Sequence, residues 1–262
     1  MTDIAAVVLA AGKGKRMKSD LAKVLHTLFG RPMIEYLIDT LISLNIKKIV
    51  IVIGHQAELV TATLGKYQGK IEFALQAEQL GTGHAVLVTE EALSGFSGDI
   101  LVTAGDVPFL TRETIDKLLA VHRREKASAT VLSSIPPDPA GYGRVIRFPG
   151  TDLVDRIVEH KDADEDQRKI GEINSGTFCF DSQCLFAALR RIRADNSQNE
   201  YYLTDVMEIL RGQGHKAAVC LADDPDEVLG VNSSEQLTEL EARFGQKAGF
   251  RAPIGRQERI KK

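Results

Sequence analysis

The chain has 262 residues, a formal net charge of −3 and 44% hydrophobic residues. This size is sufficient for one large domain, or a domain with an elaboration, and the nearly balanced charge argues against nucleic-acid binding. The longest uninterrupted apolar run, residues 4–11, is shorter than the roughly 20 residues that a membrane-spanning helix needs. The three cysteines form no CxxC pair and no secretory leader pattern opens the sequence. We therefore expect a cytoplasmic protein that contacts neither nucleic acid nor membrane.

Apolar runs typical of strands alternate with helical patterns up to about residue 125. Residues 5–10 predict a strand buried on both faces, and apolar residues recurring from Pro32 to Ile42 predict a helix. Further strands are predicted at 47–54, 71–76 and 99–106, and further helices at 56–64, 84–93 and 111–125. Thr111 is the expected N-cap of the last of these helices. The alternation predicts an α/β protein with a doubly wound parallel sheet.

The pattern changes after residue 128, where strand-like runs follow one another with few helices between them. Strands are predicted at 129–135, 143–148, 153–160, 172–180 and 216–222, and helices at 184–193 and 203–212. Ser233 and Gln236 form a candidate capping box for a last helix through Leu237, Leu240 and Phe244. We expect this region to extend the sheet and to add a small antiparallel layer. Residues 245–262 are expected to be a basic, solvated tail.

The loop after the first predicted strand, "LAAGKGKRM" at residues 9–17, combines two glycines with a dense positive charge. Position 17 is Met, so the loop is not the GxGxxG fingerprint of dinucleotide-binding proteins, and it does not match a Walker loop. Five basic residues lie between positions 13 and 23, namely Lys13, Lys15, Arg16, Lys18 and Lys23. Such a loop suits a polyphosphate, although charge alone favours a solvated basic loop equally.

The order of the motifs separates these two interpretations. "LAAGKGKRM", "QAEQLGTGHAV", "GDVPF", "GYGR", "IVEHKDA", "EINSG", "EYYLTD" and "GVN" occur in this order between residues 9 and 232. Together they resemble the uridylyltransferase domain of the bifunctional N-acetylglucosamine-1-phosphate uridylyltransferase/glucosamine-1-phosphate acetyltransferase family, and the resemblance extends over about 4–244. It implies a nucleotide-diphospho-sugar transferase fold with a Rossmann-like mixed sheet and a small antiparallel sugar-binding elaboration.

The resemblance also implies a domain organisation. We expect one nucleotidyltransferase domain at 1–244, with a nucleotide-binding half at about 1–135 and a sugar-binding half at about 136–232. No hexapeptide β-helix repeat is present in the sequence, so we expect no left-handed β-helix acetyltransferase domain and no acetyl transfer. Because that β-helix forms the family's trimer contact, a monomer or weak dimer is expected.

The reaction implied by the resemblance joins UTP to N-acetylglucosamine 1-phosphate, giving UDP-N-acetylglucosamine and pyrophosphate. The sugar-phosphate nucleophile is already anionic, so the chemistry requires positioned cations and Mg²⁺ rather than a general base. The family match assigns the metal to Asp106 and Asn232, the leaving pyrophosphate to Arg16, and the substrate phosphates to Lys23. Without the resemblance, a turn before Pro108 is the favoured interpretation of Asp106, and Asn232 alone is typical of a cap or turn residue.

The same match assigns the remaining binding residues. The residues assigned to the nucleotide are Leu9, Ala10, Ala11, Gly12, Gly14, Gln76, Gly81 and Thr82. Gln76 is expected to face the uracil, since an amide can pair with both the N3–H and a carbonyl. The residues assigned to the sugar are Gly143, Glu159, Asn174, Tyr202 and Thr204. Each also has an ordinary interpretation, such as a core aromatic for Tyr202.

The chain departs from the family pattern at Lys15, Ala22, Ala104 and Phe109, where the family usually has Thr, Pro, an aromatic or hydroxyl residue, and Leu. Two alternative functions stay open: transfer involving another nucleotide or sugar 1-phosphate, with thymine fitting almost as well as uracil, and a non-catalytic nucleotide-sugar-binding module. The presence of Arg16, Lys23 and Asp106 argues against the second. A nicotinamide dehydrogenase is disfavoured by Met17.

Overall fold

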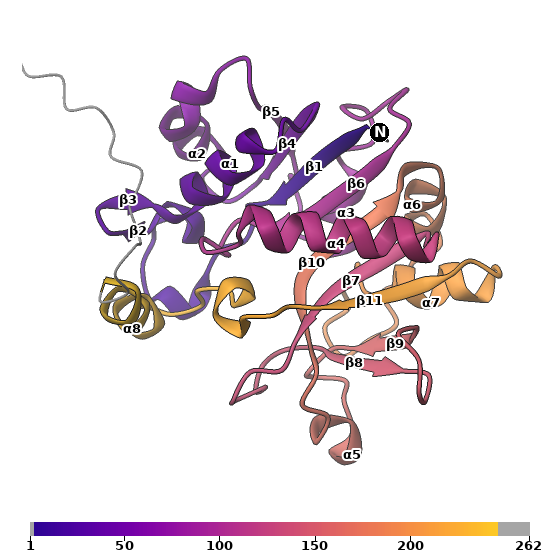
Figure 1. Cartoon of the computed structure of the whole chain (residues 1–262). Coiled ribbons are helices and arrows are strands. Elements are labelled where there is room, and N and C mark those ends of the chain that lie inside the picture. The colour runs from indigo at the N-terminus through magenta and orange to yellow at the C-terminus, as the bar shows by residue number, and fades with distance from the viewer. Residues whose placement is uncertain (1–2, 246–262) are drawn as a thin grey trace, which may run out of the picture.

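The computed structural model describes residues 3–245 and centres on a nine-stranded sheet (Figure 1). Seven strands run in the order β11-β7-β10-β6-β1-β4-β5. Their bounds are β1 Ile4–Leu9, β4 Lys48–Ile53, β5 Glu72–Leu75, β6 Asp99–Ala104, β7 Ala129–Ser134, β10 Ile173–Asp181 and β11 Ala217–Leu221. Strand β10 is antiparallel to its neighbours β6 and β7, whereas β1, β4, β5 and β6 pair in parallel, as do β7 and β11.

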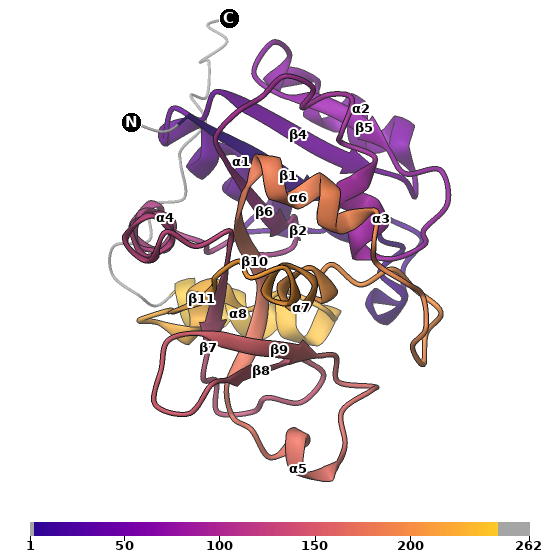
Figure 2. The ribbon, with the colours of Figure 1, turned by 90° about the vertical axis from the view of Figure 1, so that its right-hand side faces the viewer.

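Two further strands, β8 (Arg144–Arg147) and β9 (Val154–Val158), form an antiparallel hairpin that joins the sheet through β10. The predicted α/β fold, with its mixed sheet and small antiparallel addition, is therefore confirmed. The hairpin lies beyond the main sheet together with the short helix α5 (Glu165–Arg168) (Figure 2).

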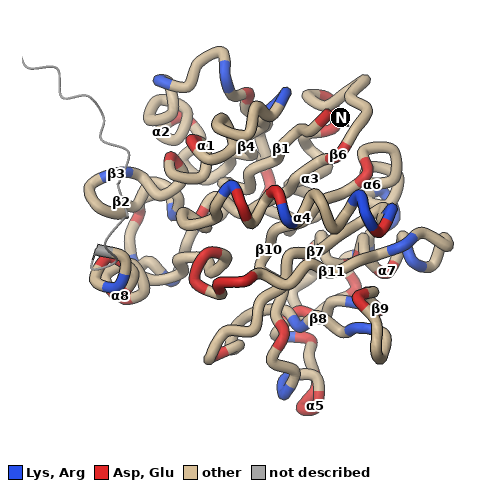
Figure 3. The backbone as a smooth tube through the Cα atoms, viewed as in Figure 1, with Lys and Arg blue, Asp and Glu red and all other residues tan. Residues whose placement is uncertain are grey.

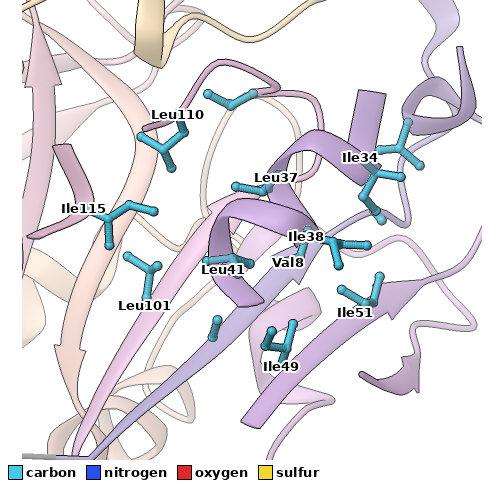
Figure 4. Packing of buried hydrophobic residues seen from close by; sticks show 14 of the residues in the cluster. Val8, Ile34, Leu37, Ile38, Leu41, Ile49, Ile51, Leu101, Leu110 and Ile115 are labelled. Carbon is cyan, nitrogen blue, oxygen red and sulfur yellow. The ribbon is translucent and has the colours of Figure 1, made fainter. Parts of the chain in front are cut away.

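Helices cover both faces of the sheet. One core contains side chains of α1 (Met33–Ser43), α2 (Ala57–Thr63) and α4 (Arg112–Glu125), and the other contains those of α3 (Thr82–Leu87), α6 (Ser182–Leu189) and α7 (Asp205–Gly212). Alternate residues of β1 serve the two cores, with Ala6 and Val8 on the α1 side and Ala5 and Val7 on the other. This explains why β1 reads as a continuous apolar run. Figure 4 shows Ile34, Leu37 and Leu41 of α1 packed over the strands.

A third, smaller core is built from side chains outside the nine-stranded sheet. The hairpin of β2 (Thr27–Leu28) and β3 (Arg31–Pro32) packs there with the C-terminal helix α8 (Ser234–Gly245). Phe109, in the loop after β6, joins this core with Leu240 and Phe244 of α8. The remaining short elements are 3₁₀ helices: η1 Lys15–Met17, η2 Lys23–Leu25, η3 Leu64–Tyr67 and η4 Pro225–Val228.

Each predicted helix and strand is present, and its bounds agree within two residues except at the C-terminal ends of α3 and α6. The short strands β2 and β3 and the helix α5 were not predicted. Helix α3 begins at Thr82 and ends at Leu87, short of the expected residue 93, and Thr89 Oγ1 bonds the Val86 carbonyl just beyond it at 2.7 Å. Helix α6 ends at Leu189 instead of residue 193. Ser233 Oγ accepts from the Gln236 amide, but the Gln236 side chain turns to the amide of Asn232, so the capping box forms only by half. Thr111 caps α4 as predicted.

Charged residues of both signs are interspersed along the chain, and acidic residues gather in the segment between β11 and α8 (Figure 3). Within residues 3–245 no helix has the length and apolar character needed to cross a membrane. The basic tail predicted at 245–262 falls, beyond its first residue, outside the described part of the chain.

Candidate active site

Two cavities lie side by side at the edge of the sheet where β1, β5 and β6 end. The first has a volume of about 560 Å³ and is lined by the loop after β1, by the segment between β5 and α3, and by Lys23. The second, of about 240 Å³, is lined by the loops around β8, β9 and β10 and by the segment before α8. The residues common to both linings are Leu9, Thr82, Ala104 and Asp106. The carboxyl ends of parallel strands are where doubly wound folds bind ligands.

The loop after β1 is held in a defined shape by its contact with η2. Gly14 has a φ of +59°, and a Cβ at this position would lie 2.7 Å from Lys23 Cβ. Any side chain here would therefore push Lys23 out of place. The predicted nucleotide residues Leu9, Ala10, Ala11, Gly12 and Gly14 all line the first cavity.

Asp106, Asn232, Lys23 and Arg16 form one polar cluster where the cavities meet. The Lys23 ammonium contacts Asp106 Oδ2 in a close ion pair and donates to Asn232 Oδ1 at 2.7 Å. Arg16 Nη2 donates to the same Asn232 oxygen at 2.7 Å. These residues are up to 216 positions apart in sequence, yet the four side chains predicted to handle phosphate and metal come together. Arg16 lies on the side of the second cavity.

The donor set of this cluster suits a hard divalent cation. One carboxylate and one amide oxygen already converge on a single positive charge, the ammonium of Lys23. Magnesium typically takes one or two carboxylates and completes its shell with substrate phosphates and water. Among the described residues no group of three or more His, Cys, Asp or Glu side chains is placed to hold a metal without such help.

Gln76 follows β5 and is buried at the wall of the first cavity. Its Nε2 donates to the carbonyl of Gly81 at 3.0 Å and lies 3.1 Å from His84 Nδ1. These contacts fix the amide, and no donor among the described residues bonds its Oε1. His84, for which the sequence indicated a structural role only, thus orients Gln76. Gly81 and Thr82 line the cavity beside it.

The second cavity collects four of the five residues predicted to bind the sugar: Gly143, Glu159, Asn174 and Thr204. Thr204 Oγ1 donates to Glu159 Oε1 at 3.0 Å, and the backbone N–H of Asn174 donates to the Gly143 carbonyl at 2.9 Å. Burial raises the pKa of Glu159; the hydrogen bond from Thr204 opposes this shift, and repulsion from nearby acids adds to it.

Tyr202, the fifth predicted sugar residue, does not line either cavity. It is buried, and its hydroxyl donates to Asp162 and accepts from Gln198 Nε2 at 2.9 Å. The structure instead adds Tyr142, whose phenol lies close to Asp106 and Asn232. The pKa of Tyr142 is raised by burial first and by the charge of Asp106 second. The only sequence signal for Tyr142 is its place between two loop glycines.

A third cavity, of about 660 Å³, lies away from these residues. It is at the opposite end of β1 and β4, where Asp3, Lys48 and Glu72 line it, and none of the predicted site residues takes part. Lys48 is paired there with Glu72. Size alone therefore does not identify the functional site of this fold.

Residues 6–217 match the MobA-like NTP transferase domain, and the chain belongs to this family of nucleotidyltransferases. It is 48% identical over 241 residues to the bifunctional protein GlmU of Halalkalibacterium halodurans, and 49% identical over 236 residues to that of Oceanobacillus iheyensis. The alignments cover 92% and 90% of this chain but 52% and 51% of those proteins. The chain thus spans about half the length of the curated relatives it matches, and the resemblance inferred from the ordered motifs is confirmed.

The fold is also found in a more distant solved structure. HddC from Yersinia pseudotuberculosis, determined as a complex with GMP-PN, superimposes with a TM-score of 0.68 at 18% identity. The match covers 93% of this chain and 100% of HddC. At this identity, the similarity between the two proteins is one of fold.

Proposed function

We propose that the protein is a uridylyltransferase that forms UDP-N-acetylglucosamine and pyrophosphate from UTP and N-acetylglucosamine 1-phosphate. The observation that carries this proposal is the position of Asp106, shared by two cavities of which one suits a nucleotide and the other a sugar. The similarity to bifunctional GlmU proteins supports the choice of substrates. A cytoplasmic location, a nucleotide-binding half at about 1–135 and a sugar-binding half at about 136–232 are part of the same proposal.

The reaction is an in-line displacement. An oxygen of the sugar phosphate attacks the α-phosphorus of UTP, and the bond from that phosphorus to the β-phosphate oxygen breaks, leaving pyrophosphate with the electron pair. The nucleophile carries no proton at neutral pH, so no base is needed. Lys23 and Arg16 reduce the repulsion between the two anions and stabilise charge on the leaving group. When bound by Asp106 and Asn232, Mg²⁺ supplies further charge neutralisation on the phosphates.

Base and sugar are recognised on opposite sides of this centre. The Gln76 amide is fixed by Gly81 and His84, which leaves its Oε1 to accept the N3–H of uracil. In the other cavity, Glu159 accepts hydrogen bonds from the sugar hydroxyls, and Asn174 faces the same space. The backbone of Gly143 comes close to the acetamide because a glycine leaves room for it.

One assay tests the proposal directly. The protein is incubated with Mg²⁺, each of UTP, dTTP, ATP, CTP and GTP, and a panel of sugar 1-phosphates, and pyrophosphate release is measured. We expect the highest kcat/KM for UTP with N-acetylglucosamine 1-phosphate. Release only from a different pair would assign another substrate, and no release from any pair would show that the protein is not a nucleotidyltransferase for these substrates.

A further inference from the structure

The two oxygens proposed to hold the metal already have a cation between them. Lys23 Nζ contacts both Asp106 Oδ2 and Asn232 Oδ1. The side chains of Lys23 and Asp106 are only 16% and 13% exposed, so water screens the pair weakly. Lys23 reaches this position from η2, where the first carbons of its side chain lie against Gly14.

An ammonium group and a divalent ion cannot occupy the same position between these oxygens. If both were held close to Asp106, their repulsion would be large in a partly buried site. The lysine side chain must therefore leave Asp106 when a metal binds there. Lys23 also lines the first cavity beside Gly12 and Gly14, where a triphosphate would provide other oxygens for its ammonium.

We propose that Lys23 is a built-in competitor for the metal and that its transfer from Asp106 to the nucleotide phosphates couples metal binding to nucleotide binding. The inference rests on the proposed function. Without nucleotide, Lys23 closes the metal site and keeps metal affinity low. With nucleotide bound, the phosphates draw the ammonium away, and the Asp106 and Asn232 oxygens become available. The same lysine therefore lowers the affinity for one ligand and raises it for the other.

The proposal is tested by two binding measurements on Lys23→Met. Mn²⁺ is titrated in the absence of nucleotide and followed by electron paramagnetic resonance of the free ion. UTP is titrated separately by calorimetry in EDTA. A charge-assisted hydrogen bond to Asp106 is lost in the variant, so we expect Mn²⁺ to bind about tenfold more tightly than to wild type. UTP should bind about tenfold more weakly, since a phosphate partner is removed.

Lys18→Met is the matched control, because Lys18 lies in the same loop, is 79% exposed and pairs with Glu235 at 3.7 Å. Its Mn²⁺ affinity should change by less than about twofold, since a screened surface charge acts weakly. The double variant Lys23→Met/Asp106→Asn should lose the gain in Mn²⁺ affinity, which would locate that gain at Asp106. Thermal unfolding of each variant checks that the fold persists.

The opposite changes expected in Mn²⁺ affinity and UTP affinity distinguish competition from damage to the site. A distorted site would bind both Mn²⁺ and UTP more weakly, and this result would overturn the proposal. Equal gains in Lys23→Met and Lys18→Met would also overturn it, because they would reflect net charge only. If the variant behaves as expected but wild-type protein releases no pyrophosphate from any substrate pair, the proposed function fails while the competition at Asp106 stands.

Discussion

Phe109 and Phe244 stack with ring centroids 3.8 Å apart and an angle of 8° between the ring planes. Phe109 lies in the same loop after β6 as Asp106, and Phe244 is near the end of α8, the helix that follows Asn232. The stack therefore ties together the two segments that carry the proposed metal ligands. It also gives a role to Phe109, where the resembled family usually has Leu.

Loss of the stack is predicted to weaken both the fold and the metal site. Phe244→Ala removes a buried aromatic side chain, and we expect a loss of about 2–3 kcal/mol in the free energy of unfolding, measured in urea. The Mg²⁺ concentration for half-maximal activity should rise about threefold or more, as α8 holds Asn232 less firmly. Phe244→Leu keeps most of the apolar contact and should show smaller changes. If the Phe244→Ala protein is less stable but its Mg²⁺ dependence is unaltered, the stack does not support the metal site.

The backbone at Gly81 is predicted to tolerate no side chain. Its φ is +114°, and a Cβ would lie 2.6 Å from the Tyr201 carbonyl oxygen. Gly81→Ala should therefore lower the free energy of unfolding by about 1–3 kcal/mol and weaken UTP binding, because the segment that fixes Gln76 must move. Gly65→Ala is the control, since a Cβ there meets no heavy atom within 4 Å. Equal stability of the two variants would contradict the close approach seen at Tyr201.

Asp205, the first residue of α7, is predicted to make stability depend on pH. Burial, followed by repulsion from Glu208 and Asp162, raises the pKa of Asp205 from 3.8 to about 6. Since the folded state holds this proton more tightly, the stabilising contribution is complete below about pH 4 and is lost as the pH rises through about 6.

Asp205→Asn removes this titration. Because the carboxyl is only partly buried, we expect the stability of the variant relative to wild type to increase by about 1 kcal/mol between pH 4 and pH 8. Urea unfolding at several pH values measures the difference. Asp223→Asn, at a carboxylate that is 84% exposed and paired with Lys117, provides the comparison. Parallel pH profiles for wild type and Asp205→Asn would refute the assignment.

Local sequence patterns predicted most elements, because strands buried on both faces read as continuous apolar runs and caps such as Thr111 act within one helical turn. Helix ends were predicted less well where competing contacts decide them, as at Thr89 after α3. The insertion of β10 between β6 and β7 depends on pairing between distant segments, which periodicity does not encode.

In the candidate site, too, local features could be predicted from the sequence and contacts between distant segments could not. The lining of the first cavity follows from strand ends and glycines, so Gln76 and Asp106 could be predicted in place. The contact between Lys23 and Asp106 spans 83 positions and could not be derived from spacing. Tyr202, predicted to bind the sugar, lies outside both cavities because Asp162 and Gln198 hold its hydroxyl, whereas Tyr142, for which no role was predicted, lines the second cavity.

The most direct test of the account is the turnover of Asp106→Ala with UTP, N-acetylglucosamine 1-phosphate and saturating Mg²⁺. Since Asp106 is the charged side chain common to both cavities, we predict that kcat falls by at least about a hundredfold while the thermal unfolding midpoint stays near that of wild type. Asp20→Ala is the control, since Asp20 is exposed beyond the loop that follows β1, and this variant should retain activity. A folded Asp106→Ala protein with near-normal kcat would contradict the central claim that this carboxylate holds the two reactants together.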